Sequence, residues 1–359
     1  KTLDSSDPEV PPTADIGEMV EQVTGMDTQA ALAAFDRMSG EVHPSLAGIV
    51  LEGHALYGQT VTRRMAERRE ALGADRLHGG AWVGGYGASS ELDGDGNAHA
   101  ADWDLRGLAV GFDTWGTEHW LIGASANVMQ LDADFRAGDR GEVDAKNLSL
   151  YTSFQGERAY IDAVASYAWW DNDTTRAVEV GDIDRTATAS YNSHRFATYV
   201  EGGWTFNVGE RSLLQPLLAL QYDNLASQAL EEDGAQDLSL IGRSDSVERL
   251  TLGAGVRWSN TLRRGDWTLE PTAQARWLHS EGDEYPEFDV AFSGAPNGGY
   301  RLPEFGWRVR GVTLPQDRGV LGLGLAARND NLDLFVDYDF QAGDGFKAHN
   351  LSAGLRYRW

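Results

Sequence analysis

Three neighbouring residues, His279, Ser280 and Glu281, combine a base, a hydroxyl and a carboxylate, which are the groups that nucleophilic catalysis uses. They fall near the end of a segment in which apolar and polar residues alternate as in a strand. Adjacent side chains of a strand point to opposite faces, so His279 and Ser280 are not expected to share a site. Catalysis by this part of the chain is therefore not predicted.

A cluster of carboxylates begins at the same place and offers oxygen ligands that suit Ca²⁺: Glu281, Asp283, Glu284, Glu287 and Asp289. Their spacing matches no known calcium loop, so a solvated acidic loop is the preferred interpretation. The chain has no Cys, and its sequence contains no phosphate loop, zinc-ligand spacing or nucleotide fingerprint. We predict neither a metal site nor a cofactor.

Charged residues gather in the longest helical segment. Apolar positions recur every three or four residues from Leu46 to Met65, Pro44 suits the first turn and Gly73 suits the stop, which predicts a helix from Pro44 to Leu72. At 1.5 Å per residue this helix is roughly 40 Å long, enough to cross a bilayer. It cannot lie in lipid, because its second half carries four arginines: Arg63, Arg64, Arg68 and Arg69.

These four arginines need a polar environment or charged partners. The strand segments further along the chain carry carboxylates on the face opposite to their apolar positions: Asp162, Glu201, Glu270, Asp333 and Asp337. A helix lodged inside a barrel of strands would bring both sets together, as a charged plug in a wet lumen. The alternative is that both sets are solvated, since exposed ion pairs contribute only about 0–1 kcal/mol each.

Two shorter helices are expected before the charged one. Asp15 is placed to cap a helix that ends at Gly25, and Asp27 to cap a second helix that ends at Met38. Residues 1–76 are therefore predicted to form a helical segment, and residues 77–359 a separate domain.

From about His78 onward the pattern changes to period-two alternation, separated by turns rich in Gly, Asp and Asn, and we predict twelve antiparallel strands. The last strand is the clearest, with Leu351, Leu355, Tyr357 and Trp359 alternating with small or polar residues. Short turns alternate with longer, acidic loops. This arrangement predicts an all-β membrane protein, a twelve-stranded transmembrane β-barrel of a bacterial outer membrane with the N-terminal helical segment threading its pore.

The composition agrees with a barrel. No run of about 18 apolar residues exists, which excludes a helical membrane protein, and the formal charge of −25 argues against nucleic-acid binding. The long region after Glu281 is expected to contain strand structure of its own. Nine tryptophans are expected to form interfacial girdles as a group, although single members could point inward: Trp82, Trp103, Trp115, Trp120, Trp169, Trp204, Trp258, Trp277 and Trp359.

Two parts of the chain resemble the translocator domain of classical autotransporters, the type V secretion systems. Residues 35–46, with the sequence FDRMSGEVHPSL, resemble the linker ahead of the pore helix of that family. Residues 334–340, LFVDYDF, followed by residues 349–359, HNLSAGLRYRW, resemble its C-terminal strands. The resemblance covers roughly Asp27 to Trp359. One departure is Pro44, where the family more often has Ala, and it is expected to sharpen the helix start.

The resemblance implies an outer-membrane domain, not itself an enzyme, that helps to carry an N-terminal passenger to the cell surface and then keeps the linker helix in its pore. It implies several partners: the barrel-assembly machinery, periplasmic chaperones, and the lipid and lipopolysaccharide around a monomeric barrel. Three residues of the last strand would form the assembly signal: Leu355, Tyr357 and Trp359.

The fate of the passenger is also an expectation from the resemblance. Family members that cut themselves inside the barrel use an Asn in the helix, whereas no Asn precedes Asn97 here. The passenger is therefore expected to stay attached or to be released by another protease, and it could itself be an enzyme. Two alternatives stay open for the barrel: an outer-membrane enzyme, or a passive porin-like or adhesin-like barrel. A porin has no need of a long charged helix, and an enzyme needs a convergent site at the rim.

Overall fold

The computed structural model describes residues 13–70, 79–295, 306–329 and 331–358. Three helices come first: α1 (Ala14–Thr24), α2 (Thr28–Met38) and α3 (Val42–Glu70). Twelve long strands follow among the described residues: β1 (Gly80–Leu92), β2 (Ala101–Trp115), β3 (Trp120–Phe135), β4 (Arg140–Gln155), β5 (Ala159–Val180), β6 (Ile183–Trp204), β8 (Ser212–Ser227), β11 (Val247–Asn260), β13 (Trp267–Gly282), β16 (Asp317–Asn329), β17 (Leu332–Gly343) and β18 (Phe346–Arg358).

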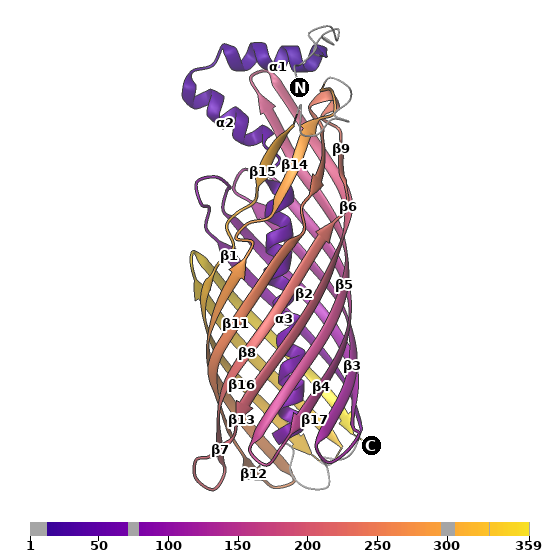
Figure 1. The fold of residues 1–359 in the computed structure, drawn as a ribbon, viewed down its shortest axis with the longest axis vertical. Helices are drawn as coiled ribbons and strands as arrows, with labels where there is room; N and C mark the ends of the chain where they lie inside the picture. The colour runs from indigo at the N-terminus through magenta and orange to yellow at the C-terminus, as the bar shows by residue number, and fades with distance from the viewer. Residues whose placement is uncertain (1–12, 71–78, 296–305, 330, 359) are drawn as a thin grey trace, which may run out of the picture.

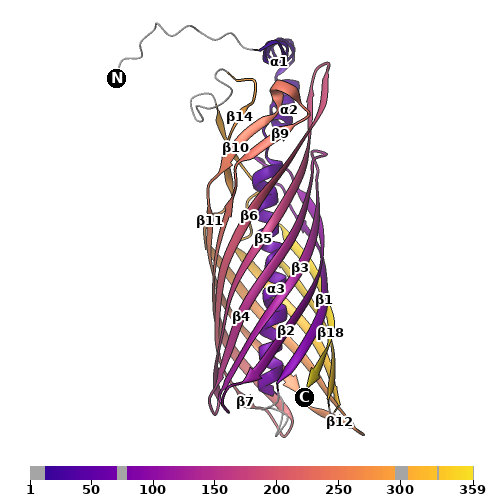
Figure 2. The ribbon, with the colours of Figure 1, turned by 90° about the vertical axis from the view of Figure 1, so that its right-hand side faces the viewer.

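The twelve strands close into a barrel. Each strand pairs antiparallel with the next one along the chain, and β1 pairs with β18 from Gly80 opposite Arg358 to Leu92 opposite Phe346. Helix α3 runs along the inside of this barrel in both views (Figures 1 and 2). The predicted twelve-stranded barrel with a helix in its pore is therefore confirmed. The helix begins two residues before Pro44, and the predicted end at Leu72 lies outside the described residues.

The outer face of the barrel carries an apolar band. Along β5, the outward side chains are apolar from Ile161 to Trp169 and become acidic at Asp171 and Asp173. Large apolar side chains elsewhere on the outer face are similarly exposed, including Leu150, Leu218 and Leu323. In water these faces would be covered by another layer of protein, whereas lipid covers them in a membrane barrel.

The connections at the two ends of the barrel differ. At the end that holds the C-terminus the turns are short, as predicted (Figure 1). At the other end the prediction of longer loops is wrong for three connections, at residues 136–139, 181–182 and 344–345. At residues 181–182 the reason is that β5 and β6, with 22 residues each, continue past the apolar band as a hairpin, so that strands replace the expected loop.

Two of the three remaining connections at this end, between β8 and β11 and between β13 and β16, form a small sheet above the barrel. It consists of β9 (Leu230–Asp233), β10 (Leu240–Ser244), β14 (Glu287–Phe292) and β15 (Trp307–Arg310), with the 3-10 helix η2 (Gln236–Leu238) beside it. The expected strand structure after Glu281 is therefore confirmed. Two further short strands, β7 (Phe206–Asn207) and β12 (Leu262–Arg264), lie at the turns of the opposite end.

Helices α1 and α2 lie outside the barrel, over the tip of the β5–β6 hairpin (Figures 1 and 2). Met19, Met38, Val178, Ile183 and Leu238 belong to one buried apolar cluster that joins them. The predicted cap of α2 is confirmed, because the Asp27 carboxylate accepts a hydrogen bond from the Ala30 amide at 2.9 Å. The predicted cap of α1 is wrong: Thr13 holds the N-cap position, and Asp15 lies in the first turn.

The tryptophans divide between the two faces. Trp120, Trp169, Trp204 and Trp277 are exposed on the outer face, as expected of interfacial residues, and Trp258 is partly buried. Three others are buried instead: Trp82, Trp103 and Trp115. Trp82 lies inside the barrel, where its indole donates to the Tyr151 hydroxyl at 3.0 Å. The expectation of a girdle is wrong for these three, and Trp359 lies outside the described residues.

Candidate functional site

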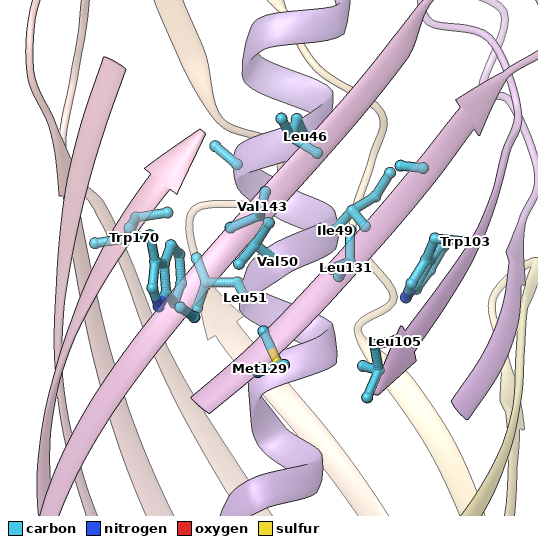
Figure 3. Close-up of a cluster of buried hydrophobic side chains, with 14 of the residues drawn as sticks. Leu46, Ile49, Val50, Leu51, Trp103, Leu105, Met129, Leu131, Val143 and Trp170 are labelled. Carbon is cyan, nitrogen blue, oxygen red and sulfur yellow. The ribbon is translucent and has the colours of Figure 1, made fainter. Parts of the chain in front are cut away.

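The first half of α3 is held by apolar packing. Leu46, Ile49, Val50 and Leu51 are buried, and the strands beside them supply a matching apolar surface that includes Trp103, Leu105, Met129, Leu131, Val143 and Trp170 (Figure 3). These residues come from β2 to β5, so the helix lies against one side of the lumen. Among the described helices, none has the length and apolarity to span a lipid bilayer by itself.

The second half of α3 is held by charge, and its centre is Asp113 on β2. Asp113 is fully buried and accepts hydrogen bonds from Arg64, from Nε at 2.6 Å and from Nη2 at 2.9 Å. Arg68 Nε lies 3.1 Å from the same carboxylate, and the Tyr151 hydroxyl donates to it at 3.0 Å. Asp113 is not among the predicted partners; it lies two residues before the end of β2, next to the turn that the sequence predicts near Thr114.

The other two helix arginines reach two of the predicted carboxylates. Arg69 forms a buried ion pair with Asp162 on β5, and its guanidinium lies 3.8 Å from the centre of the Tyr160 ring. Arg63 pairs with Asp337 on β17 and, at 2.8 Å, with Asp339.

The remaining predicted carboxylates lie inside the barrel but pair with arginines of the wall. Glu201 lies 2.9 Å from Arg276, and Glu270 accepts a hydrogen bond from Arg328 at 2.8 Å. Asp333 lies 3.9 Å from Arg328. Arg328 also donates to the backbone carbonyl of Glu67 at 3.2 Å, which links this group to the helix.

Helix carboxylates and wall arginines form a second set of pairs with the opposite polarity. Glu52 pairs with Arg318 and lies 3.6 Å from Arg249, and Glu67 pairs with Arg356. The sequence reasoning missed these pairs. The signal was present, since all three arginines occupy the inward phase of their strands, but only carboxylates were considered as wall partners.

The mouth of the barrel near α2 is closed by buried polar groups. His43 at the start of α3 contacts Glu232 at 2.8 Å, and Arg176 holds the same carboxylate at 2.6 Å. Beside them, Glu41 contacts His99 Nδ1 at 2.5 Å. Burial raises the pKa of the Glu41 carboxyl, and the hydrogen bonds from His99 oppose that rise.

The candidate catalytic and metal-binding residues are not assembled into a site. His279 lies on the outer face between Asp317 and Glu281, both at 3.0 Å, whereas Ser280 is buried and shares a hydrogen bond with Thr251 at 2.9 Å. Glu287 and Asp289 both accept hydrogen bonds from Arg308. Within the described residues, no three His, Asp or Glu side chains are grouped so that they could hold a metal ion.

What the arrangement can do is hold a charged helix in one position. The ion pairs described above join cations and anions on both helix and wall, so neither member of such a pair is left as an isolated buried charge. Such pairs fix depth and rotation of the helix more than they add stability, because desolvation offsets much of their attraction. The C-terminal strand presents Leu355 and Tyr357 outward, both exposed on the apolar face.

Relatives of known sequence share this region. The chain is 21% identical over 327 residues to an extracellular serine protease of Serratia marcescens, covering 90% of this chain and 30% of the relative. It is 22% identical over 300 residues to outer membrane protein A of Rickettsia rickettsii, covering 77% of this chain and 12% of that protein. The chain thus spans less than a third of the length of these curated relatives.

Solved structures share the fold. The translocator domain of the autotransporter NalP from Neisseria meningitidis superimposes with a TM-score of 0.64 at 17% identity, covering 87% of this chain and 99% of that one. The transport unit of the autotransporter AIDA-I from Escherichia coli gives a TM-score of 0.55 at 16% identity, covering 80% and 93%. The family model described as the autotransporter beta-domain matches residues 81–339. The chain belongs to the autotransporter β-domain family, and is an outer-membrane β-barrel translocator with a helix in its pore.

Proposed function

We propose that this barrel carries an N-terminal passenger of its own polypeptide to the cell surface, and that α3 then stays in the lumen and closes it. The direction of α3 supports this proposal. Its first residues and α1 and α2 lie at one end of the barrel, and the short turns and the C-terminus lie at the other (Figure 2). Short turns face the periplasm in outer-membrane barrels, so polypeptide that precedes α3 leaves on the outside.

The two parts of the chain have different proposed roles. Residues 1–76 form the linker and pore-helix segment, and residues 77–359 form the translocator barrel. The barrel transports and is not catalytic, so any enzymatic activity of the full-length protein belongs to the passenger. The related protein of Serratia marcescens is named an extracellular serine protease. That name does not identify the activity of the passenger proposed here.

The proposed partners follow from the surface of the barrel. Lipid and lipopolysaccharide surround the apolar band of a monomeric barrel, periplasmic chaperones deliver the unfolded chain, and the barrel-assembly machinery recognises the last strand. Leu355 and Tyr357 support the last point, since both side chains are exposed on the lipid-facing side of β18. Trp359 completes this proposed signal.

The test is surface display of an epitope fused ahead of Lys1, behind a signal peptide, in Gram-negative cells. We expect antibody and added protease to reach the epitope on intact cells. Cells that contain the folded, heat-modifiable barrel but keep the epitope in the periplasm would contradict the proposal. Deleting Trp359 should lower the amounts of folded barrel and surface epitope together, whereas Trp204→Ala, a change at another exposed tryptophan, should lower neither.

A further inference from the structure

A cavity of about 110 Å³ lies beside α3, on the side of the lumen away from its apolar packing. Its lining comes from the middle of α3 and from inward positions on strands that include β6, β8, β11, β13 and β16. A single water needs only about 10–15 Å³ of such space, so the cavity has room for several waters or a small polyatomic ion.

The charge of the lining is one-sided. Among the described residues, five arginines and no Asp or Glu border the cavity: Arg63, Arg195, Arg257, Arg276 and Arg318. Gln221, Gln274 and the Tyr199 hydroxyl add neutral polar groups. Four of these arginines pair with carboxylates that lie outside the lining, namely Asp337, Asp223, Glu201 and Glu52. Arg257 is the fifth cation and needs a separate explanation.

Arg257 is the arginine of this lining that most clearly lacks an anionic partner. It is 7% exposed, and within the described residues its guanidinium makes no hydrogen bond or ion pair, with Nη1 buried and without a partner. The Nε atoms of Arg195 and Arg318 are buried and without a hydrogen-bond partner too. A buried guanidinium is costly unless an anion or acceptor satisfies it.

The local charges do not balance either. Glu201 interacts electrostatically with three arginines, Arg276, Arg257 and Arg69, and Asp162 is the second carboxylate of this group. Among the described residues of this group, three guanidinium groups share two carboxylates. A smaller neighbouring cavity also borders Arg257 and contains Glu67, Glu270 and Asp337, but these carboxylates are engaged by Arg356, Arg328 and Arg63.

We propose that this cavity is a binding site for a small oxyanion of the phosphate or sulfate class, with Arg257 as its principal ligand. Guanidinium groups present several N–H donors in a planar fork that matches the oxygens of such anions. The site lies inside the barrel, so the wall separates it from lipid headgroups, and the occupant is a free anion. An anion there neutralises the unpaired cation and joins the helix side of the cavity to the wall.

The test is isothermal titration of inorganic phosphate, and separately of sulfate, into the full chain folded in a neutral detergent at constant ionic strength. We expect saturable binding near one anion per barrel. Arg257→Gln should weaken binding by about tenfold or more, since a hydrogen bond to a charged group contributes that much. Arg264→Gln removes an exposed arginine from a turn and is the matched control, for which binding should be unchanged.

A second variant tests the proposal independently, in case Arg257→Gln does not fold. Ala219→Met fills the cavity from β8 without altering any charge and should also abolish binding, with heat-modifiable gel mobility reporting that the barrel is folded. Absence of saturable binding to the wild-type chain would overturn the proposal, as would equal binding by Arg257→Gln. Equal heats from chloride at the same ionic strength would show a general salt effect, and would overturn it too. Each of these results is independent of surface display.

Discussion

At the scale of single residues, Asp113 illustrates how the helix is held. One carboxylate receives hydrogen bonds from Arg64 and an ion pair from Arg68, residues one helical turn apart, so it defines both the depth and the rotation of α3. The energetic gain of such a buried group is small when all partners are present, and the loss is large when one is removed. The lumen is therefore more sensitive to unbalanced substitutions than its many ion pairs suggest.

Asp113→Asn should destabilise the folded barrel by about 3–5 kcal/mol, because it leaves two buried guanidinium groups with one neutral acceptor. The measurement is the free energy of unfolding in detergent micelles, followed by the loss of heat-modifiable gel mobility in denaturant. Asp134→Asn is the control, since Asp134 pairs with Arg140 on the exposed surface and its loss should leave the free energy nearly unchanged. Similar effects of both changes would refute a special role of Asp113.

The sequence predicted the charged helix face but not its pairing. Helical spacing identified the four arginines, and strand phase identified carboxylates that do point inward, because both periods are local properties. Which arginine meets which carboxylate depends on how deep the helix sits and how it is rotated. Arg328 engages Glu270 on the neighbouring strand β13, a contact that depends on strand register. Arg276 on β13 engages Glu201 on β6, with β8 and β11 between these strands, so this pair depends on the curvature of the wall.

At the scale of elements, α3 has two halves with different attachments. The apolar half fits a shaped surface near the mouth by the small sheet, and the charged half reaches carboxylates at the opposite end. Loss of the ion pairs should therefore loosen one end of the helix while the apolar half keeps it in the barrel.

The double variant Arg64→Ala and Arg68→Ala should raise the conductance of single barrels in planar bilayers, because the lower lumen loses two large side chains and their attachment to Asp113. The control is Arg263→Ala with Arg264→Ala, two exposed arginines of a turn. Unchanged conductance in a folded double variant would count against closure of the pore by α3.

Helix α1 has its own charged attachment outside the membrane. Arg185 donates to both carboxylate oxygens of Asp15, at 2.8 and 3.1 Å, and this hydrogen bonding lowers the pKa of Asp15. A lowered pKa means that the contribution to stability is complete above about pH 4, the value in an unfolded chain, and is lost as pH falls through the lower folded value.

Below about pH 4, hydrogen exchange in residues 14–24 should therefore accelerate relative to exchange in the barrel strands. Asp15→Asn should show the faster exchange already at neutral pH, whereas Asp36→Asn, at an exposed position on α2, should not. Exchange in α1 that does not change with pH or with Asp15→Asn would contradict this attachment.

The strands were predictable where one face is apolar and the other polar. β18 and β5 show that contrast, since lipid selects one set of side chains and the polar lumen the other. The alternation does not distinguish the two faces of β1, because glycines and small residues occupy both phases of this strand. There the inward Trp82 packs against Gly111 of β2, whose missing side chain leaves the room, and composition alone could not assign its direction.

At the scale of the whole molecule, the barrel is taller than the membrane it crosses. The apolar band of β5 ends near Trp169, yet the strand continues to Val180 with acidic outward residues. The upper part of the barrel wall therefore stands in water, and α1 and α2 rest on it rather than on the bilayer.

Cysteine labelling can map this height, because the chain has no Cys of its own. A membrane-impermeant maleimide should label Thr175→Cys on intact cells, since this outward position lies above the band. It should not label Ala165→Cys, which faces lipid on the same strand. Glu157→Cys, in a short turn, should react only after the outer membrane is permeabilised. Labelling of Ala165→Cys on intact cells would place the membrane elsewhere.

The pairing of β1 with β18 joins the first strand of the barrel to the last. Ring closure therefore requires β18, and before this pairing the wall is open along one side from top to bottom. During that interval a segment can enter or leave the interior sideways. After closure, movement is possible only along the axis. The timing of this one strand pairing thus decides which part of the polypeptide is enclosed.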